Sequence, residues 1–150
     1  MQLTRGADYG VRAMIYLASL PLRTRVSSPE LAKATDTTEA FLAKVLQRLV
    51  QARLIESFRG QGGGFALRVT AREISLLDVI EAIDGPIALN LCTTHSVTPG
   101  QTCERKEWCA AHLVWARAQS SLREILGSAS LEALAEETAR GMTSLAEVTP

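Results

Sequence analysis

Residues 54–69 read LIESFRGQGGGFALRV, two short strand-like runs on either side of a glycine-rich turn. Residues 54–59 are predicted to form one strand, and residues 65–69 alternate as a returning strand would. The turn lacks the Lys-Ser/Thr pair that ends a nucleotide-binding P-loop, and it precedes a strand instead of a helix. The stretch therefore predicts a β-hairpin and argues against a nucleotide site.

Signals for the start of a helix occur twice before this hairpin. Residues 27–30, SSPE, begin a short helix that is capped by Ser27 or by Ser28. A similar signal recurs at residues 36–39, and a longer helix is predicted over residues 38–52. Two helices joined by a short turn form a helix-turn-helix. When a hairpin follows directly, the order of elements is that of a winged helix.

The polar face of the helix over residues 38–52 can reach base edges and phosphates in a DNA major groove. The alternative is the solvated face of an ordinary helix, and the hairpin that follows favours the DNA interpretation. Glycines allow phosphates to approach the backbone closely, and an arginine can enter a narrow minor groove. The predicted DNA contacts are Thr38, Lys44 and Arg48 on the helix, and Arg59, Gly60 and Gly62 in the wing.

The flanking segments predict further helices. Residues 7–20, ADYGVRAMIYLASL, suggest a helix buried on nearly every side. Residues 74–83 form a linking helix, and residues 109–126 form a long helix that ends at Gly127. A last, acidic helix starts near residues 130–132. The predicted fold is thus mainly α with a small β-hairpin wing, a winged helix-turn-helix plus a long C-terminal dimerisation helix.

The long C-terminal helix carries an apolar seam at alternating spacings of four and three. Such a seam suits a partner helix and so a homodimer, or else it packs on its own domain, and the pattern leaves both open. The seam comprises Ala111, Trp115, Ala118, Leu122 and Ile125. The predicted organisation is a DNA-binding domain over residues 1–85, a cysteine-containing loop over 86–108, the dimerisation helix and a short helix over 109–140, and a tail over 141–150.

The composition excludes several classes of protein. The 150 residues carry 16 Lys and Arg against 16 Asp and Glu, so the whole chain does not attract nucleic acid by net charge. Six basic side chains between residues 44 and 72 nevertheless make a basic centre. No apolar run approaches the roughly 18 residues of a membrane span, and we expect a cytoplasmic protein. Two histidines, His95 and His112, and no nucleophile–base motif argue against an enzyme.

The cysteines are clustered in one segment. Cys92, Cys103 and Cys109 are the only three in the chain, and His112 follows the last by three positions. Cysteines gathered in this way in an intracellular protein bind metal or perform redox chemistry more often than they form disulfides. Three cysteines and a histidine can hold zinc in a closed tetrahedral site. Free thiols can also sense oxidation directly.

Together these motifs resemble the Rrf2 family of bacterial winged-helix transcriptional regulators, of the IscR, NsrR and RirA type. The resemblance covers almost the whole chain: the opening residues 1–4 and 8–13, the wing residues 59–65, the linking residues 74–80, and the three cysteines. It implies a homodimeric transcription factor that binds a double-stranded DNA operator and holds an iron–sulfur cluster. One departure is the ten residues between Cys92 and Cys103, where the best-known relatives have five or so.

The resemblance also implies a ligand set. Cys92, Cys103 and Cys109 are the three cluster thiolates, and because a cluster normally has four ligands, His112 or Asp8 supplies the fourth. The cluster is [2Fe–2S] or [4Fe–4S], and it senses iron, redox state or nitric oxide. Loss of the cluster would alter the loop and so the separation of the two recognition helices of a dimer, which sets half-site spacing on DNA. The expected protein is a repressor.

Overall fold

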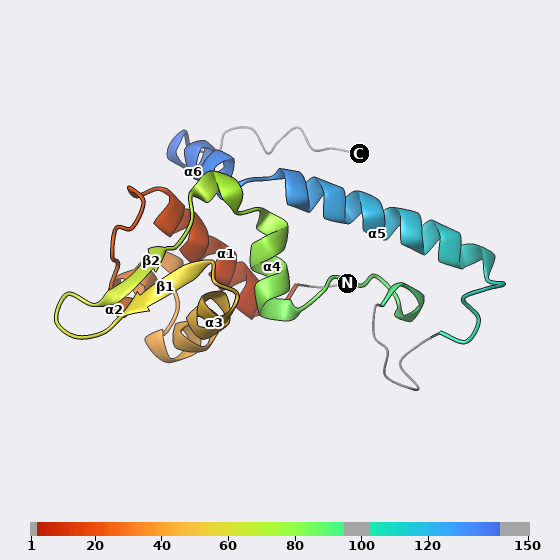
Figure 1. Cartoon of the computed structure of the whole chain (residues 1–150), viewed down its shortest axis with the longest axis horizontal. Helices are drawn as coiled ribbons and strands as arrows, with labels where there is room; N and C mark the ends of the chain where they lie inside the picture. The colour runs from red at the N-terminus through yellow and green to blue at the C-terminus, as the bar shows by residue number, and fades with distance from the viewer. Residues whose placement is uncertain (1–2, 95–102, 142–150) are drawn as a thin grey trace.

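The computed structural model describes residues 3–94 and 103–141, and one long helix projects from a helical bundle (Figure 1). The predicted mainly α fold with a β-hairpin wing is confirmed. His95 and residues 142–150 of the predicted tail lie outside the described residues. The order of elements is α1 (Arg5–Ala18), α2 (Ser28–Thr35), α3 (Glu39–Gln51), β1 (Ile55–Phe58), β2 (Gly64–Leu67), α4 (Leu76–Asp84), α5 (Ala110–Ser128) and α6 (Leu131–Ala139), with short 3₁₀ turns at Ala71–Glu73 and Leu91–Thr93.

Side-chain caps set the starts of the first three helices. The Thr4 hydroxyl accepts the N–H of Ala7 at the start of α1, and Ser27, the first of the two predicted candidates, caps α2. Thr38 caps α3 by accepting the N–H of Phe41 at 3.3 Å. Asp36, with φ 54° and ψ 50°, adopts the left-handed conformation that ends α2 and makes the tight turn into α3. The helix-turn-helix is therefore built from local signals.

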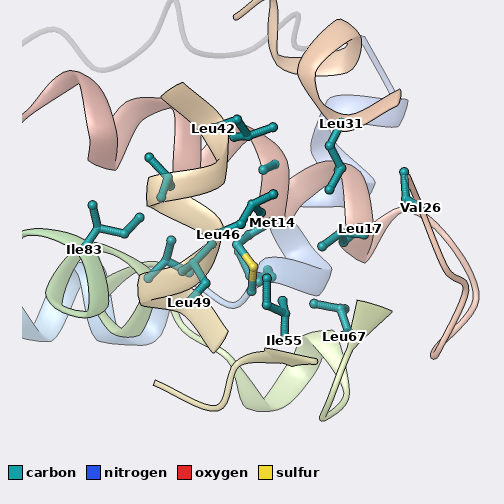
Figure 2. Packing of buried hydrophobic residues seen from close by; sticks show 14 of the residues in the cluster. Met14, Leu17, Val26, Leu31, Leu42, Leu46, Leu49, Ile55, Leu67 and Ile83 are labelled. Carbon is teal, nitrogen blue, oxygen red and sulfur yellow. The ribbon is translucent and has the colours of Figure 1, made fainter. Parts of the chain in front are cut away.

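The hydrophobic core lies around α1, which packs against α2, α3, α4 and α6. Figure 2 shows aliphatic side chains from several of these elements converging on Met14, which is fully buried. The core is aliphatic because the chain has few aromatic residues, only 5%. Phe41 of α3 lies at the edge of this core. It is 38% exposed, and its ring meets Tyr9 of α1 edge-on at 5.5 Å.

The wing is an antiparallel pair, with Ile55 opposite Leu67 and Phe58 opposite Gly64. Its second strand is also fixed to the segment before α2, because Phe65 and Val26 exchange backbone hydrogen bonds of 2.8 and 2.9 Å. This bridge anchors the base of the wing to the segment that leads into the helix-turn-helix, so the two parts keep a fixed relative position.

Helix α5 extends away from the bundle (Figure 1). The predicted end at Gly127 is wrong, since the helix continues to Ser128; a single glycine near the end of a helix costs only about 1 kcal/mol and need not stop it. Ser75 and Ser130 form a β-bridge that ties the segment after α5 to the start of α4. Across the described ranges, no helix combines the length and apolarity needed to cross a membrane.

Candidate DNA interface and cysteine site

An open groove of about 740 Å³ lies between the first turn of α2, the exposed face of α3 and the wing. Ser28 comes from α2, Gln47 and Gln51 from α3, and Arg59 and Gly60 from the wing. The start of a helix offers backbone N–H groups to a phosphate, and glutamine amides can pair with adenine edges. The groove therefore brings the start of a helix and two glutamine amides to one open surface.

The six predicted DNA contacts fall into two groups, of which one makes side-chain hydrogen bonds within the protein. Lys44 and Arg59 are exposed, and Gly60 and Gly62 have positive φ of 87° and 74° with open space around them. The two other predicted contacts are engaged within the protein: the Thr38 hydroxyl caps α3, and the Arg48 guanidinium donates to the backbone carbonyl of Ile83 in α4.

Sequence reasoning missed several residues of this region. Gln47 and Gln51 of α3 are exposed and line the groove but are not among the predicted contacts, although glutamine is a common base reader. Arg25 precedes the helix-turn-helix in sequence, yet its guanidinium lies 3.9 Å from the centre of the Phe58 ring. This cation–π contact brings a positive charge to the wing, and no local sequence signal pairs residues so far apart.

The cysteine region is built around a short 3₁₀ turn. Cys92 lies in this turn, is 8% exposed, and lines a pocket of about 360 Å³ with His112, Lys106 and Arg123. The Nδ1 atom of His112 is buried and has no hydrogen-bond partner within the described ranges. Buried polar atoms almost always have a hydrogen-bond partner, so this unpaired nitrogen is expected to bind a ligand, an ion or a water.

The other predicted ligands lie elsewhere. Cys103 and Cys109 are half-buried free thiols and do not line the pocket of Cys92. Asp8 is exposed on α1, where it pairs with Arg12 at 2.9 Å. In the part of the chain that the structure describes, no three His, Cys, Asp or Glu side chains are grouped so that they could hold a metal ion. The donors fit an iron–sulfur cluster in kind, and the structure brings two of them, Cys92 and His112, to one pocket.

The predicted seam of α5 is exposed. Trp115 and Ile125 are 40% and 66% exposed, and Leu113 and Val114 beside them are 68% and 66% exposed. The interpretation that the seam packs on its own domain is therefore wrong for this chain. An exposed apolar face of this kind marks a surface for association.

Comparison with known proteins adds four likenesses. The model of the Rrf2 family, described as an iron-dependent transcriptional regulator, matches residues 3–137. The HTH-type transcriptional regulator Rv1287 of Mycobacterium tuberculosis is 34% identical over 131 residues, which are 87% of this chain and 79% of that protein. Staphylococcus aureus CymR in its oxidised form is 29% identical, with a TM-score of 0.69 over 91% of this chain and 97% of that one. IscR of T. potens shares the fold, with a TM-score of 0.73, 23% identity, and coverage of 96% of this chain and 93% of that one.

Proposed function

The chain belongs to the Rrf2 family of transcriptional regulators and is not an enzyme, and from that premise we propose that it is a cytoplasmic, homodimeric repressor whose binding to operator DNA is controlled by an iron–sulfur cluster. The observation that carries the cluster is the buried, unpaired Nδ1 of His112 beside Cys92, in a chain with three cysteines in one segment. The DNA-binding half of the proposal rests on the groove between α2, α3 and the wing.

The DNA-reading surface combines two kinds of contact. Arg59 is an exposed cation that lines the groove, and Lys44 is an exposed cation on α3 that lines a neighbouring pocket; both suit phosphates. Gln47 and Gln51 are exposed on α3, line the groove and suit base edges. Two copies of this surface in one dimer would read two half-sites, whose spacing follows from the separation of the two α3 helices.

The proposed dimer forms along α5. Its apolar residues recur at helical spacing and are exposed over the length of the helix, which is the pattern of a surface that packs on a second helix. Burying a large apolar side chain such as Ile125 contributes about 1.5–3 kcal/mol. Several such residues on each of two helices supply the affinity that a homodimer needs.

The proposed ligands are the thiolates of Cys92, Cys103 and Cys109, with His112 or Asp8 as the fourth. When bound, an iron–sulfur cluster supplies a centre that responds to iron supply, oxidation or nitric oxide. Holding the cluster requires Cys103 and Cys109 to approach the pocket of Cys92, so binding is coupled to a change in the positions of these two cysteines. That coupling makes cluster loss a change in the shape of the protein.

A second candidate is a regulator without a cluster, in which the thiols themselves sense oxidation or a closed zinc site is structural. Two observations favour it. The three thiols are free and, in the described ranges, no three donors gather at a metal site. The similar CymR of Staphylococcus aureus has also been solved in an oxidised form, and a thiol sensor is the chemistry that such a form suggests.

One experiment separates the candidates. The protein is purified without oxygen, and its visible spectrum, iron and zinc are measured for the wild type, Cys103→Ala and the matched control Ser120→Ala, which changes a pocket residue that is not a ligand type. A brown protein with stoichiometric iron, whose colour is lost in Cys103→Ala and kept in the control, supports the cluster. His112→Ala and Asp8→Asn then identify the fourth ligand. A colourless protein that contains zinc, or one that contains neither metal even after reconstitution, supports the second candidate, a regulator without a cluster.

The DNA interface is tested by salt-dependent binding. The operator is a duplex selected by the wild-type protein from a random library, and the variants are Lys44→Gln, Arg59→Gln and Gln47→Ala. Loss of a phosphate contact at Lys44 or Arg59 should lower the slope of log K against log salt by about 1. Loss of a base contact at Gln47 should relax base preference at one position, at a cost of about 1–3 kcal/mol. Arg117→Gln, on the exposed surface of α5, is the control that should change neither.

A further inference from the structure

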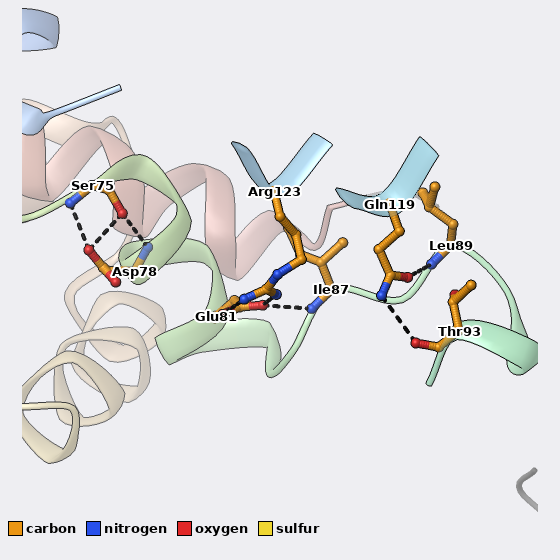
Figure 3. A network of polar contacts seen from close by, with 8 residues as sticks. All are labelled: Ser75, Asp78, Glu81, Ile87, Leu89, Thr93, Gln119 and Arg123. Carbon is orange, nitrogen blue, oxygen red and sulfur yellow. Dashed lines mark hydrogen bonds and ion pairs between the residues drawn. The ribbon is translucent and has the colours of Figure 1, made fainter. Parts of the chain in front are cut away.

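We propose that Gln119 and Arg123 of α5 are positioning residues that tie the turn carrying Cys92 to helix α4, and that α4 passes changes at this turn to the recognition helix α3 through Arg48. This inference deepens the proposed function, because it names the contacts that connect the cysteine pocket to the DNA-reading surface. It is carried by a continuous set of side-chain contacts, most of which Figure 3 shows.

Gln119 is the only residue of α5 that is buried, with 7% of its surface exposed. Both ends of its amide are used: Oε1 accepts the N–H of Leu89, and Nε2 donates to the carbonyl of Thr93, each at 3.1 Å (Figure 3). Leu89 precedes the turn Leu91–Thr93 and Thr93 is its last residue, so the two partners lie on either side of Cys92. The amide therefore clamps both ends of the cysteine turn to α5.

Arg123 lies one helical turn further along α5 and connects it to α4. Its guanidinium forms a two-pronged ion pair with Glu81, in which Nη1 bonds Oε1 and Nη2 lies 3.3 Å from Oε2. Glu81 also accepts the N–H of Ile87 at 3.0 Å, at the start of the segment that leads to Cys92 (Figure 3). Glu81 thus fixes α5 and this segment to the same point of α4, with side chains that are only 36% and 24% exposed for Arg123 and Glu81.

The last turn of α4 continues the connection. Two positions after Glu81, the backbone carbonyl of Ile83 accepts a hydrogen bond from Arg48 of α3. The Ile83 side chain is 3% exposed and lies against the surface of α1 at Gly10, where a methyl group would overlap it. Because α4 is packed this closely, it moves as a unit, and a displacement at Glu81 reaches Arg48. Arg48 is thereby assigned a role within the protein instead of at the DNA.

The first measurement uses reduced, metal-free, full-length protein and needs neither operator nor cluster. Amide hydrogen exchange is compared for the wild type, Gln119→Met, Arg123→Gln and the exposed control Arg117→Gln. We expect both clamp variants to exchange faster over residues 87–93 and also over α4 and α3, by about 2- to 30-fold, which is the range for residues in a coupled network. The control should match the wild type. Exchange in α3 that is unchanged in both clamp variants would overturn the inference.

The second measurement tests regulation. For each protein, affinity for the selected operator duplex is measured in two states, reconstituted with iron and sulfide or metal-free, and reduced or oxidised. The ratio between states should fall towards one in Arg123→Gln and in Gln119→Met. The charge swap Glu81→Arg with Arg123→Glu restores the ion pair between α4 and α5 but not the acceptor for the Ile87 N–H. It should therefore recover part of the ratio that Arg123→Gln loses, which a loss of stability alone would not do. A ratio that equals that of the wild type in both clamp variants would contradict the proposal.

The outcomes separate this inference from the proposed function. If the wild type itself has a ratio of one in both pairs of states, the proposed regulation fails, and hydrogen exchange alone decides whether the clamp connects the cysteine turn to α3. If the wild type responds and the variants respond equally, the proposed function stands and the clamp is refuted. If Gln119→Met fails to fold, Arg123→Gln and its charge-swapped partner carry both measurements.

Discussion

Gly10→Ala together with Ile83→Val tests the close packing of α1 on α4. A methyl group at Gly10 would overlap Cδ1 of Ile83 and lie 3.1 Å from Cγ1 of Val45. Overpacking of this kind costs about 1–3 kcal/mol, whereas replacing glycine by alanine inside a helix returns about 0.8–1.0 kcal/mol. The single change should therefore destabilise the protein by up to about 2 kcal/mol.

The double variant isolates the overlap. Ile83→Val removes the Cδ1 atom that a methyl at Gly10 would meet, at a cost of about 0.5–1.5 kcal/mol on its own. With the overlap gone, the alanine keeps its helix-forming advantage, so the double variant should be more stable than the sum of the two single changes predicts. The difference equals the overpacking term, about 1–3 kcal/mol, which exceeds the roughly 0.3–0.5 kcal/mol by which independent changes depart from additivity.

The assay is urea unfolding at one fixed protomer concentration, since the stability of a dimer depends on concentration. Gly127→Ala is the matched control, because Gly127 is also helical and its new methyl would lie 3.7 Å from Leu77, an ordinary contact. The control should gain about 0.4–1 kcal/mol. Additive single and double variants, or a Gly10→Ala protein as stable as the control, would refute the packing that we describe between α1 and α4.

Three further outcomes follow from the structure. Gly64→Ala should weaken DNA binding more than it changes α-helix content, because Gly64 has φ 147° and a methyl there would overlap the Val26 carbonyl that anchors the wing; wild-type affinity for the selected duplex would contradict this. The Glu73 carboxylate accepts hydrogen bonds from the hydroxyl and the backbone N–H of Thr70, and these lower its pKa below 4.5. The stability that this carboxylate contributes is therefore present above pH 4.5 and is lost as the pH falls through the lowered pKa. The urea midpoints of the wild type and Glu73→Gln should converge in acid, and a constant difference down to about pH 2 would contradict this. Cys92 is 8% exposed, so in reduced, metal-free protein one thiol per chain should react with a thiol reagent more slowly than the other two, and mass mapping that finds Cys92 among the fast thiols would exclude the pocket geometry.

The DNA-binding half could be predicted from sequence because its signals are local. Ser27, Thr38 and Ser75 are caps that act within three residues, and the glycine run at residues 60–64 sets the turn by its own backbone preferences. Each signal needs only its immediate neighbours to act. The boundaries of these elements are therefore close to the predicted ones. Helix α5 ends one residue past the predicted stop at Gly127, next to Ala129, whose carbonyl accepts the N–H of Leu76 at the start of α4.

The hydrogen bonds that polar side chains make within the protein could not be predicted. Arg48 has the sequence context of a DNA contact, and its hydrogen bond to the carbonyl of Ile83 depends on the position of a residue 35 places away in the chain. Gln119 is a polar residue in an amphipathic helix, and such residues usually face solvent. Its amide instead bonds the backbone N–H of Leu89 and the backbone carbonyl of Thr93. The periodicity of the sequence does not indicate these two hydrogen bonds.

The arrangement of α4 explains why one joint can control both halves of such a regulator. In the described ranges, the principal contacts of α5 are with α4 and with the turn that carries Cys92. A dimer formed along α5 therefore holds each DNA-binding unit through that joint, in which Glu81 and Arg123 form the ion pair. If α4 rotated about this pair, as we propose, the two α3 helices of the dimer would change their separation, and with it the half-site spacing that the dimer reads.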